Sequence, residues 1–278
     1  MDTARQTESA GGHVTIHEHL PYRPGVDELR MSLFLPDSAG GPVPCVVAIQ
    51  GGGFASQTGH GFRPFAEAIA GDGFAAALIS YRGLPDHTCA TTLADVQEAV
   101  RYVRTAAGDY AIDPDRIGAF GRSAGGTLAA LLGVAPDDRP DAPSSRVQAV
   151  VAMAGVYDFI GRFTEDRQAA MQPRLEERRR SNAEWIGATF APEDADWRRA
   201  SAIRHVHADG PPMLLLHCKD DATVPWLQSQ AMCDAVRSAG GACEVKYSPR
   251  GGHGFQTDDG GDAPLQEMLA FFRRTLGR

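Results

Sequence analysis

Residues 116–132 read RIGAFGRSAGGTLAALL, and this stretch decides the fold of the chain. It begins as a short, mostly apolar strand and ends in TLAALL, a run of good helix formers. Between them, residues 121–125 match the pattern G-x-S-x-G. In that context the serine, Ser123, occupies a sharp strand-to-helix turn, and its hydroxyl projects above the sheet. The stretch therefore predicts a nucleophilic serine rather than an ordinary glycine-rich turn.

The two glycines of this pattern have a steric reason. A Cβ atom at Gly121 or Gly125 would collide with the neighbouring strand or helix, because the turn brings the backbones close together. The following helix begins at the serine, so its first N–H groups and the positive end of its dipole face a developing oxyanion. We therefore expect the turn to support negative charge beside Ser123.

The composition is that of a globular protein. The 278 residues are 43% hydrophobic and 22% charged, which suits one large α/β domain with an insertion, or two small domains. A net charge of −8 argues against nucleic-acid binding, because an acidic surface repels phosphate. No apolar run reaches membrane-spanning length, and the polar N-terminus lacks the apolar region of a signal peptide, so we expect a cytoplasmic protein.

Neither the cysteines nor the first strand predicts a metal site. The five cysteines lack zinc-binding spacing, and Cys45 and Cys218 lie in apolar strands, where a thiol acts as a small buried hydrophobe. His17 and His19 share one face of a strand, while Glu18 points to the other. We expect solvated strand residues there, and neither a metal nor a cofactor.

Strands alternate with helices along most of the chain. An antiparallel hairpin at 14–19 and 29–35 precedes continuous apolar runs, which are typical of strands buried on both faces. We expect these strands at 43–49, 74–80, 116–120, 147–153, 213–217 and 243–247, with helices that include 62–70, 93–107, 224–239 and 264–276. The sequence thus predicts an α/β fold with a mostly parallel central sheet and helices on both faces.

Two segments depart from this alternation. Residues 1–12 are polar and end in two glycines, so we expect a disordered N-terminus. Residues 157–207 are charged and helical in pattern, and would lie above the carboxyl ends of the strands, where ligands bind in open α/β folds. We therefore predict a small helical cap at 157–207, inserted into a core of 13–156 and 208–278. The apolar residues of the cap either line a pocket or hold it to the sheet.

A serine nucleophile needs a base. His253 is the best candidate, because it lies among glycines on a loop after the last strand, at the sheet edge that also carries Ser123. His205 and His207 fall in the predicted cap, and His217 lies inside a strand or at its end, so these three are poorer candidates.

The carboxylate and the oxyanion hole are less sharply defined. Asp220 and Asp221 both follow the strand 213–217, and adjacent side chains point to opposite sides. An oxyanion hole needs two or three converging backbone N–H groups. Ala124, next to the nucleophile, supplies one, and the three glycines 51–53 after the strand 43–49 can supply the others.

Together these blocks resemble the α/β-hydrolase superfamily, specifically the carboxylesterases with an HGGG oxyanion loop. Those are the hormone-sensitive-lipase-like and the feruloyl and acetyl-xylan esterase-like groups. The resemblance covers most of the chain from about Val14 and rests on SYR at 80–82, DPDRI at 113–117, GRSAGG at 121–126, DATVP at 221–225 and GHGF at 252–255. These blocks are specific for the fold and the triad, but not for the substrate.

The resemblance also implies roles for individual residues. Ser123 would be the nucleophile, His253 the base and Asp221 its orienting carboxylate, chosen over Asp220 by its spacing to 224–225. The implied oxyanion donors are Gly52, Gly53 and Ala124. One position departs from the family, which usually has histidine where this chain has Gln50. An amide both donates and accepts, so we expect Gln50 to hold the loop by hydrogen bonds.

The sequence therefore predicts a serine hydrolase that cleaves a small carboxylic ester through an acyl-enzyme, without a cofactor. Hydrolysis of an amide or formamide, as in kynurenine formamidase, remains open, as do an acyltransferase, a lactonase and a cyclase. A non-catalytic ligand binder on the same fold is disfavoured by the presence of His253. The expected partner is a small ester, and analogy with such esterases suggests a homodimer.

Overall fold

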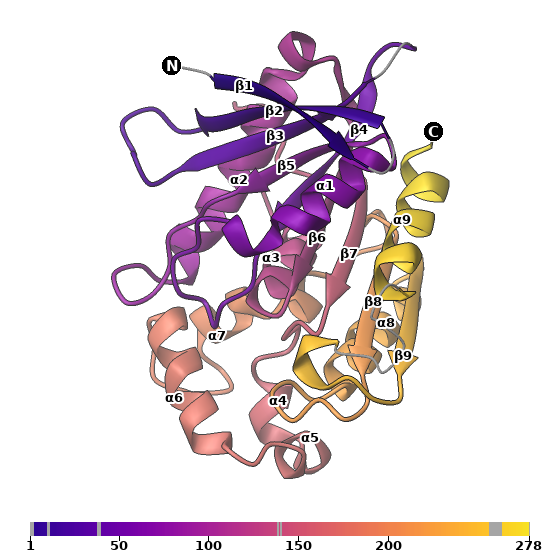
Figure 1. Cartoon of the computed structure of the whole chain (residues 1–278). Coiled ribbons are helices and arrows are strands. Elements are labelled where there is room, and N and C mark those ends of the chain that lie inside the picture. Colours follow the sequence, from indigo (N-terminus) through magenta and orange to yellow (C-terminus); the bar gives the residue numbers. More distant parts are fainter. Residues whose placement is uncertain are drawn as a thin grey trace.

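The computed structural model describes residues 3–9, 12–37, 40–137, 139, 141–255 and 263–277. Within these ranges the chain forms a nine-stranded sheet in the order β1-β2-β3-β5-β4-β6-β7-β8-β9 (Figure 1). The strands are β1 (Thr3–Ser9), β2 (Gly12–Pro21), β3 (Arg30–Pro36), β4 (Val43–Ile49), β5 (Ala75–Ile79), β6 (Ile112–Arg122), β7 (Ala149–Met153), β8 (Met213–Cys218) and β9 (Cys243–Ser248).

The direction of the strands follows the pattern of apolar residues. Strands β1, β2, β3 and β5 pair antiparallel in that order, and every pair from β5 through β4 to β9 is parallel. Strands β5, β7 and β8 are buried at every position, as the continuous apolar runs predict. The predicted hairpin and the mostly parallel sheet are confirmed.

Helices cover both faces of the sheet. Helices α2 (Cys89–Thr105), α3 (Ala124–Val134) and α8 (Leu227–Ser238) pack into one apolar core, on one face. Helices α1 (Arg63–Gly71) and α9 (Ala263–Leu276) pack into a second core, on the other face. All residues of α3 are buried, which fixes the helix that begins directly after Ser123.

The N-terminal segment differs from its prediction. Residues 1–12 were expected to be disordered, but Thr3–Ser9 form β1, which pairs antiparallel with β2 along its whole length. A ladder of backbone hydrogen bonds does not require apolar side chains, and β2 offers an open edge to which β1 can pair. The polar composition therefore gave no signal for this strand. Residues 1, 2, 10 and 11 lie outside the described residues.

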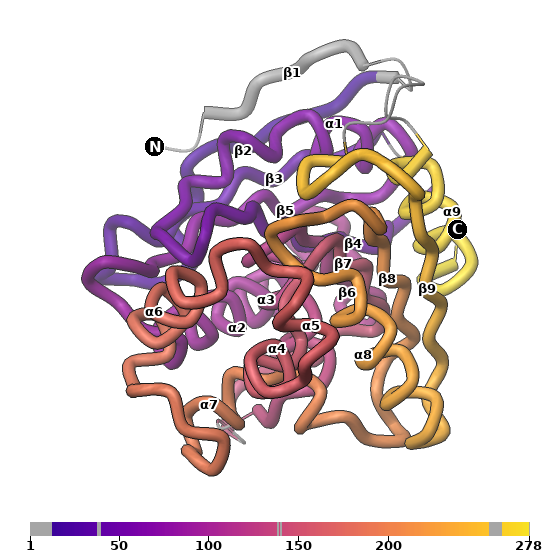
Figure 2. Tube along the Cα trace, turned by 90° about the horizontal axis from the view of Figure 1, so that it is seen from below, coloured from indigo at the N-terminus to yellow at the C-terminus, as the bar shows by residue number. Residues whose placement is uncertain are grey.

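Residues 157–207, hereafter the cap segment, form short helices between β7 and β8. They are α4 (Gly161–Thr164), α5 (Asp166–Ala170), α6 (Leu175–Ile186), α7 (Ala195–Ala200) and the 3-10 helix η3 (Ala202–His205). Figures 1 and 2 show α4–α7 gathered at the carboxyl ends of the parallel strands. Trp185, Ile186 and Trp197 are buried in the core that contains α2 and α3, so these residues hold the segment to the sheet.

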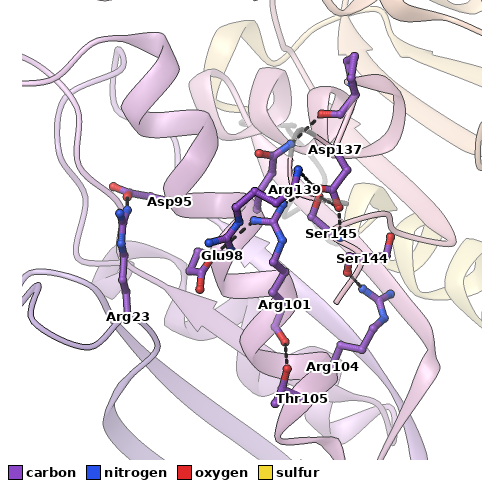
Figure 3. A network of polar contacts seen from close by, with 12 residues as sticks. Arg23, Asp95, Glu98, Arg101, Arg104, Thr105, Asp137, Arg139, Ser144 and Ser145 are labelled. Carbon is purple, nitrogen blue, oxygen red and sulfur yellow. Dashed lines mark hydrogen bonds and ion pairs between the residues drawn. The ribbon is translucent and has the colours of Figure 1, made fainter. Parts of the chain in front are cut away.

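The loop after α3 is tied to α2 by a polar network (Figure 3). Arg101 of α2 binds the carboxylates of Glu98 and Asp137, and Asp137 also accepts the N–H of Ser145 at 2.7 Å. Arg104, one turn further along α2, donates to the carbonyls of residues 114, 144 and 146. These contacts hold the connection between α3 and β7 in place.

The cysteines behave as the sequence predicts. All five are free and buried, and the side chains of Cys45 and Cys218 have no exposed surface. Burial raises the pKa of the Cys45 thiol to about 12, so this thiol stays protonated and inert. In the ranges given above, none of the helices is both long and apolar enough to cross a bilayer.

Candidate active site

The loops that follow four of the parallel strands meet at one edge of the sheet. Strand β6 leads to Ser123, β4 to the glycines 51–53, β8 to Asp221 and β9 to His253. Because parallel strands all end at the same edge, residues up to 202 positions apart in the sequence come together there. The cap segment lies over this edge (Figure 2).

The turn at Ser123 is strained, and the glycines beside it are required. Ser123 has φ 56° and ψ −123°, a conformation that few non-glycine residues adopt. A Cβ atom on Gly121 would lie 2.1 Å from the carbonyl oxygen of Gly125. A Cβ atom on Gly125 would lie 2.0 Å from the carbonyl oxygen of Ile49. The predicted steric reason for both glycines is therefore confirmed.

A chain of hydrogen bonds links the serine to a buried carboxylate. The Ser123 hydroxyl lies 2.8 Å from Nε2 of His253, and Nδ1 of His253 lies 2.7 Å from Oδ2 of Asp221. A carboxylate can only accept, so Nδ1 carries the proton and Nε2 accepts from the hydroxyl. Asp221 is 2% exposed, while the His253 side chain is 28% exposed. The histidine is therefore accessible from the solvent.

The two adjacent aspartates have different partners. Oδ1 of Asp221 accepts the N–H groups of Thr223 and Val224 at 2.8 and 3.0 Å, in addition to the contact of Oδ2 with His253. Asp220 instead accepts the N–H groups of Gly251 and Gly252, at 3.2 and 2.8 Å. Asp220 thus holds the loop that carries the histidine, and Asp221 binds the histidine itself.

The environment keeps Asp221 charged. Burial acts to raise the pKa of this carboxyl, but hydrogen bonds from His217, His253 and the N–H of Val224 outweigh it and hold the pKa well below its usual range. A permanently charged Asp221 fixes the proton on Nδ1 of His253. It therefore leaves Nε2 of His253 free to accept the serine proton.

The glycine-rich loop lies against the serine turn. A Cβ atom on Gly51 would lie 2.2 Å from the Arg122 carbonyl oxygen and 3.0 Å from the Ser123 Cβ, so only glycine allows this approach. Among the described residues, no hydrogen bond takes up the N–H groups of Gly52, Gly53 and Ala124. These are the three groups that the resemblance implies as oxyanion donors, and they are available to a ligand.

Gln50 holds the glycine-rich loop, as the sequence predicts. Its Nε2 donates to Oε1 of Gln57 at 2.7 Å, and its Oε1 accepts the N–H of Gly61 at 2.7 Å. Its carbonyl accepts the hydroxyl of Tyr81 at 2.7 Å. The amide nitrogen and the amide oxygen of Gln50 are both hydrogen-bonded, so glutamine can hold the loop at the position where the family that the sequence resembles has histidine.

Two supporting contacts escaped the sequence analysis. Phe54, which follows the glycines, stacks on Trp185 of α6 with ring centroids 3.8 Å apart. Arg82 forms a bidentate ion pair with the wholly buried Asp95, at 2.9 and 2.7 Å. The ion pair could have been anticipated from the sequence, because Asp95 lies one turn before Ala99 on the buried face of α2, where a carboxylate needs a partner. The aromatic pair had none, since it joins the loop to a distant helix.

The other histidines lie outside this arrangement, except one. His205 contacts the carbonyl of Arg199, and His207 lies beside Arg146. Glu18, which lies between His17 and His19 on the first predicted strand, forms an ion pair with Arg63 at 2.9 Å. In the part of the chain that the structure describes, no three side chains are grouped as metal ligands. The exception is His217, whose Nε2 lies 3.3 Å from Oδ2 of Asp221.

Comparison with known proteins agrees with this architecture. The model of the family described as BD-FAE matches residues 31–236. Esterase LipQ of Mycobacterium tuberculosis is 32% identical over 249 residues, which are 85% of this chain and 56% of that protein. The chain spans about half the length of the curated relatives it matches.

Solved structures give a similar result over nearly whole chains. A thermophilic esterase of the planctomycete Thermogutta terrifontis, with butyrate bound, is 26% identical with a TM-score of 0.74, covering 98% of this chain and 93% of that one. A truncated carbohydrate esterase from gut microbiota has a TM-score of 0.79 at 23% identity, over 99% of both chains, and this likeness shows the fold.

Proposed function

The chain belongs to the BD-FAE family and has the α/β-hydrolase fold, and we propose that it is a serine esterase that cleaves small carboxylic esters. The observation that carries this proposal is the line of contacts from Ser123 through His253 to Asp221, at 2.8 and 2.7 Å. A serine with a hydrogen-bonded base, itself oriented by a charged carboxylate, has the arrangement of an activated nucleophile.

The contacts suggest a two-step reaction. His253 Nε2 takes the proton of Ser123 while Oγ attacks the ester carbonyl carbon, and the oxyanion is held by the N–H groups of Gly52, Gly53 and Ala124. The imidazolium then gives this proton to the departing alcohol, which leaves an acyl-serine. A water molecule, deprotonated by the same Nε2, attacks the acyl-serine, and the carboxylic acid departs as Ser123 regains its proton.

The relatives favour an ester with a short acyl group. LipQ is named an esterase, and the Thermogutta terrifontis esterase was solved with butyrate bound. We propose the same class of substrate for this chain, with the cap segment over the site as the part that selects among esters. The alcohol is not specified by these comparisons.

A fluorophosphonate probe tests the proposal directly. We expect one adduct, mapped by mass spectrometry to Ser123, in the parent protein and none in His253→Ala. An acyl series of p-nitrophenyl esters and an N-formyl amide would then compare esters with amides; we expect acetate to butyrate to be cleaved fastest. A folded parent that takes no label would contradict the proposal and favour a ligand-binding protein. A faster reaction with the formyl amide would favour an amidase.

A further inference from the structure

His217 lies beside the proposed triad but has no part in the reaction as written above. It is the fifth residue of β8, four positions before Asp221, and its side chain has no exposed surface. The other side chains of this strand are apolar and fill the core. A histidine buried at such a place is unfavourable unless its two ring nitrogens are hydrogen-bonded.

Both nitrogens of His217 have partners. Nε2 lies 3.0 Å from the carbonyl oxygen of Val224 and 3.3 Å from Oδ2 of Asp221. Nδ1 lies 2.7 Å from the hydroxyl of Ser229, which is wholly buried in the first turn of α8. Both neighbours of Nε2 are acceptors, so Nε2 carries the proton and Nδ1 accepts from the Ser229 hydroxyl.

This placement gives Asp221 a second histidine contact in addition to that with His253. The Nε2–H of His217 donates to Val224, the residue whose own N–H binds Oδ1 of Asp221. The same N–H also faces Oδ2, the oxygen that accepts from His253. His217 therefore contacts both the turn that orients the carboxylate and the carboxylate itself, while Ser229 holds the ring of His217.

We propose that His217 is a positioning residue of the proposed triad, which acts through Asp221 to hold His253 in line with Ser123. This inference rests on the proposed esterase function. His217, which is held by β8 and by Ser229 of α8, would thus keep the loop of Asp221 in a fixed position. A misplacement of a catalytic group by about 1 Å lowers the rate by up to roughly 100-fold.

Two amide substitutions separate this role from simple packing. In His217→Gln the amide nitrogen reaches the position of Nε2 and can still donate to Val224 and Asp221. In His217→Asn the shorter amide reaches only the position of Nδ1 and can contact Ser229 alone. Glutamine is close to imidazole in size and asparagine is one methylene smaller, so a role confined to packing would appear in Tm rather than in the hydrogen bond to Asp221.

The experiment measures kcat and KM for p-nitrophenyl acetate, with the concentration of active sites determined by titration with a fluorophosphonate. The Tm of each variant is measured as well, to report on its stability. We expect His217→Asn to lower kcat by about 10- to 100-fold, with KM within about twofold, and His217→Gln to stay within about fivefold of the parent. His19, exposed on β2 and away from the site, offers a control, because His19→Asn should leave kcat unchanged. Equal kcat values for the two His217 variants would overturn the proposal.

A second readout does not depend on activity. The proton on Nδ1 of His253, held by Asp221, should give a downfield ¹H NMR signal in the parent and in His217→Gln, and lose intensity in His217→Asn. If the parent takes no fluorophosphonate label, the esterase proposal fails, and this signal still decides whether His217 positions Asp221. If His217→Asn does not fold, Ser229→Ala replaces it, and unchanged kcat and NMR signal would overturn the proposal.

Discussion

Phe54, in the glycine-rich loop after β4, stacks on Trp185 of α6 with ring centroids 3.8 Å apart and planes inclined by 16°. Phe54 has φ 66°, a left-handed backbone conformation that is unfavourable for a residue with a side chain. Burial against Trp185 offsets this strain. The indole N–H of Trp185 also donates to Thr92 of α2 at 3.2 Å. The cap segment thus holds the loop that carries two of the proposed oxyanion donors.

Replacement of this indole should affect both stability and rate. We expect Trp185→Ala to lower the free energy of unfolding by about 3–5 kcal/mol, as for other buried aromatic residues. We also expect a lower kcat, because Phe54 loses the surface that holds it. Urea unfolding and ester kinetics check these results. Phe190→Ala, at a half-buried residue of the cap segment, is the control. A folded Trp185→Ala protein with the kcat of the parent would show that the cap segment does not hold the glycine-rich loop in its active position.

The adjacent aspartates offer a matched pair of variants. Asp221→Asn should lower kcat on the order of 10⁴-fold, because an amide can stabilise the wrong tautomer of His253. Asp220→Asn should stay within about tenfold of the parent, since its remaining carbonyl oxygen can still accept from the loop of His253. Steady-state kinetics on one ester compares the two. A larger loss of kcat in Asp220→Asn than in Asp221→Asn would mean that Asp220, and not Asp221, orients His253.

Gln50→His should be tolerated. Imidazole offers one donor and one acceptor, which can replace part of the contacts that Gln50 makes with Gln57 and Gly61. We expect kcat within about tenfold of the parent, and a larger loss for Gln50→Leu, which offers neither group. Ester kinetics on both variants checks this. A fall in kcat beyond tenfold for Gln50→His would mean that the amide geometry itself is required.

The lowered pKa of Asp221 predicts how stability depends on pH. The carboxyl titrates near pH 3.9 in an unfolded chain and at lower pH in the folded protein. Its contribution to stability is therefore complete above about pH 4 and is lost as the pH falls through the folded pKa. We expect the free energy of unfolding to fall less steeply below about pH 4 in Asp221→Asn than in the parent.

Urea unfolding at a series of pH values measures this difference. Asp220→Asn makes the same change of net charge at an exposed position and serves as the control. Identical slopes for Asp221→Asn and the parent would show that the ionisation of Asp221 contributes nothing to folding.

Some features followed from the sequence because local rules decide them. Continuous apolar runs predict strands buried on both faces, and the strand–turn–helix context of Ser123 predicts its strained turn. The carboxyl ends of parallel strands must share one edge, so the loops of Ser123, His253 and the glycines were expected to meet. The polar strand β1 was missed, because a backbone ladder leaves little mark on composition.

Other features were decided only when distant segments packed together. The residues alone left Asp220 and Asp221 open; the resemblance chose Asp221, and the contacts now separate the two. The tight turn from Cys218 to Asp221 and the N–H groups that follow it direct one carboxylate inward and the other to the loop of residues 251–252.

The contact of Phe54 with Trp185 and that of His217 with Asp221 were likewise decided only by tertiary packing. Sequence periodicity gives the face on which a side chain lies, but not the partner that another segment brings to that face. Such contacts depend on the exact path of loops and on ring orientations, which only the complete packing of the sheet, its helices and the cap segment determines.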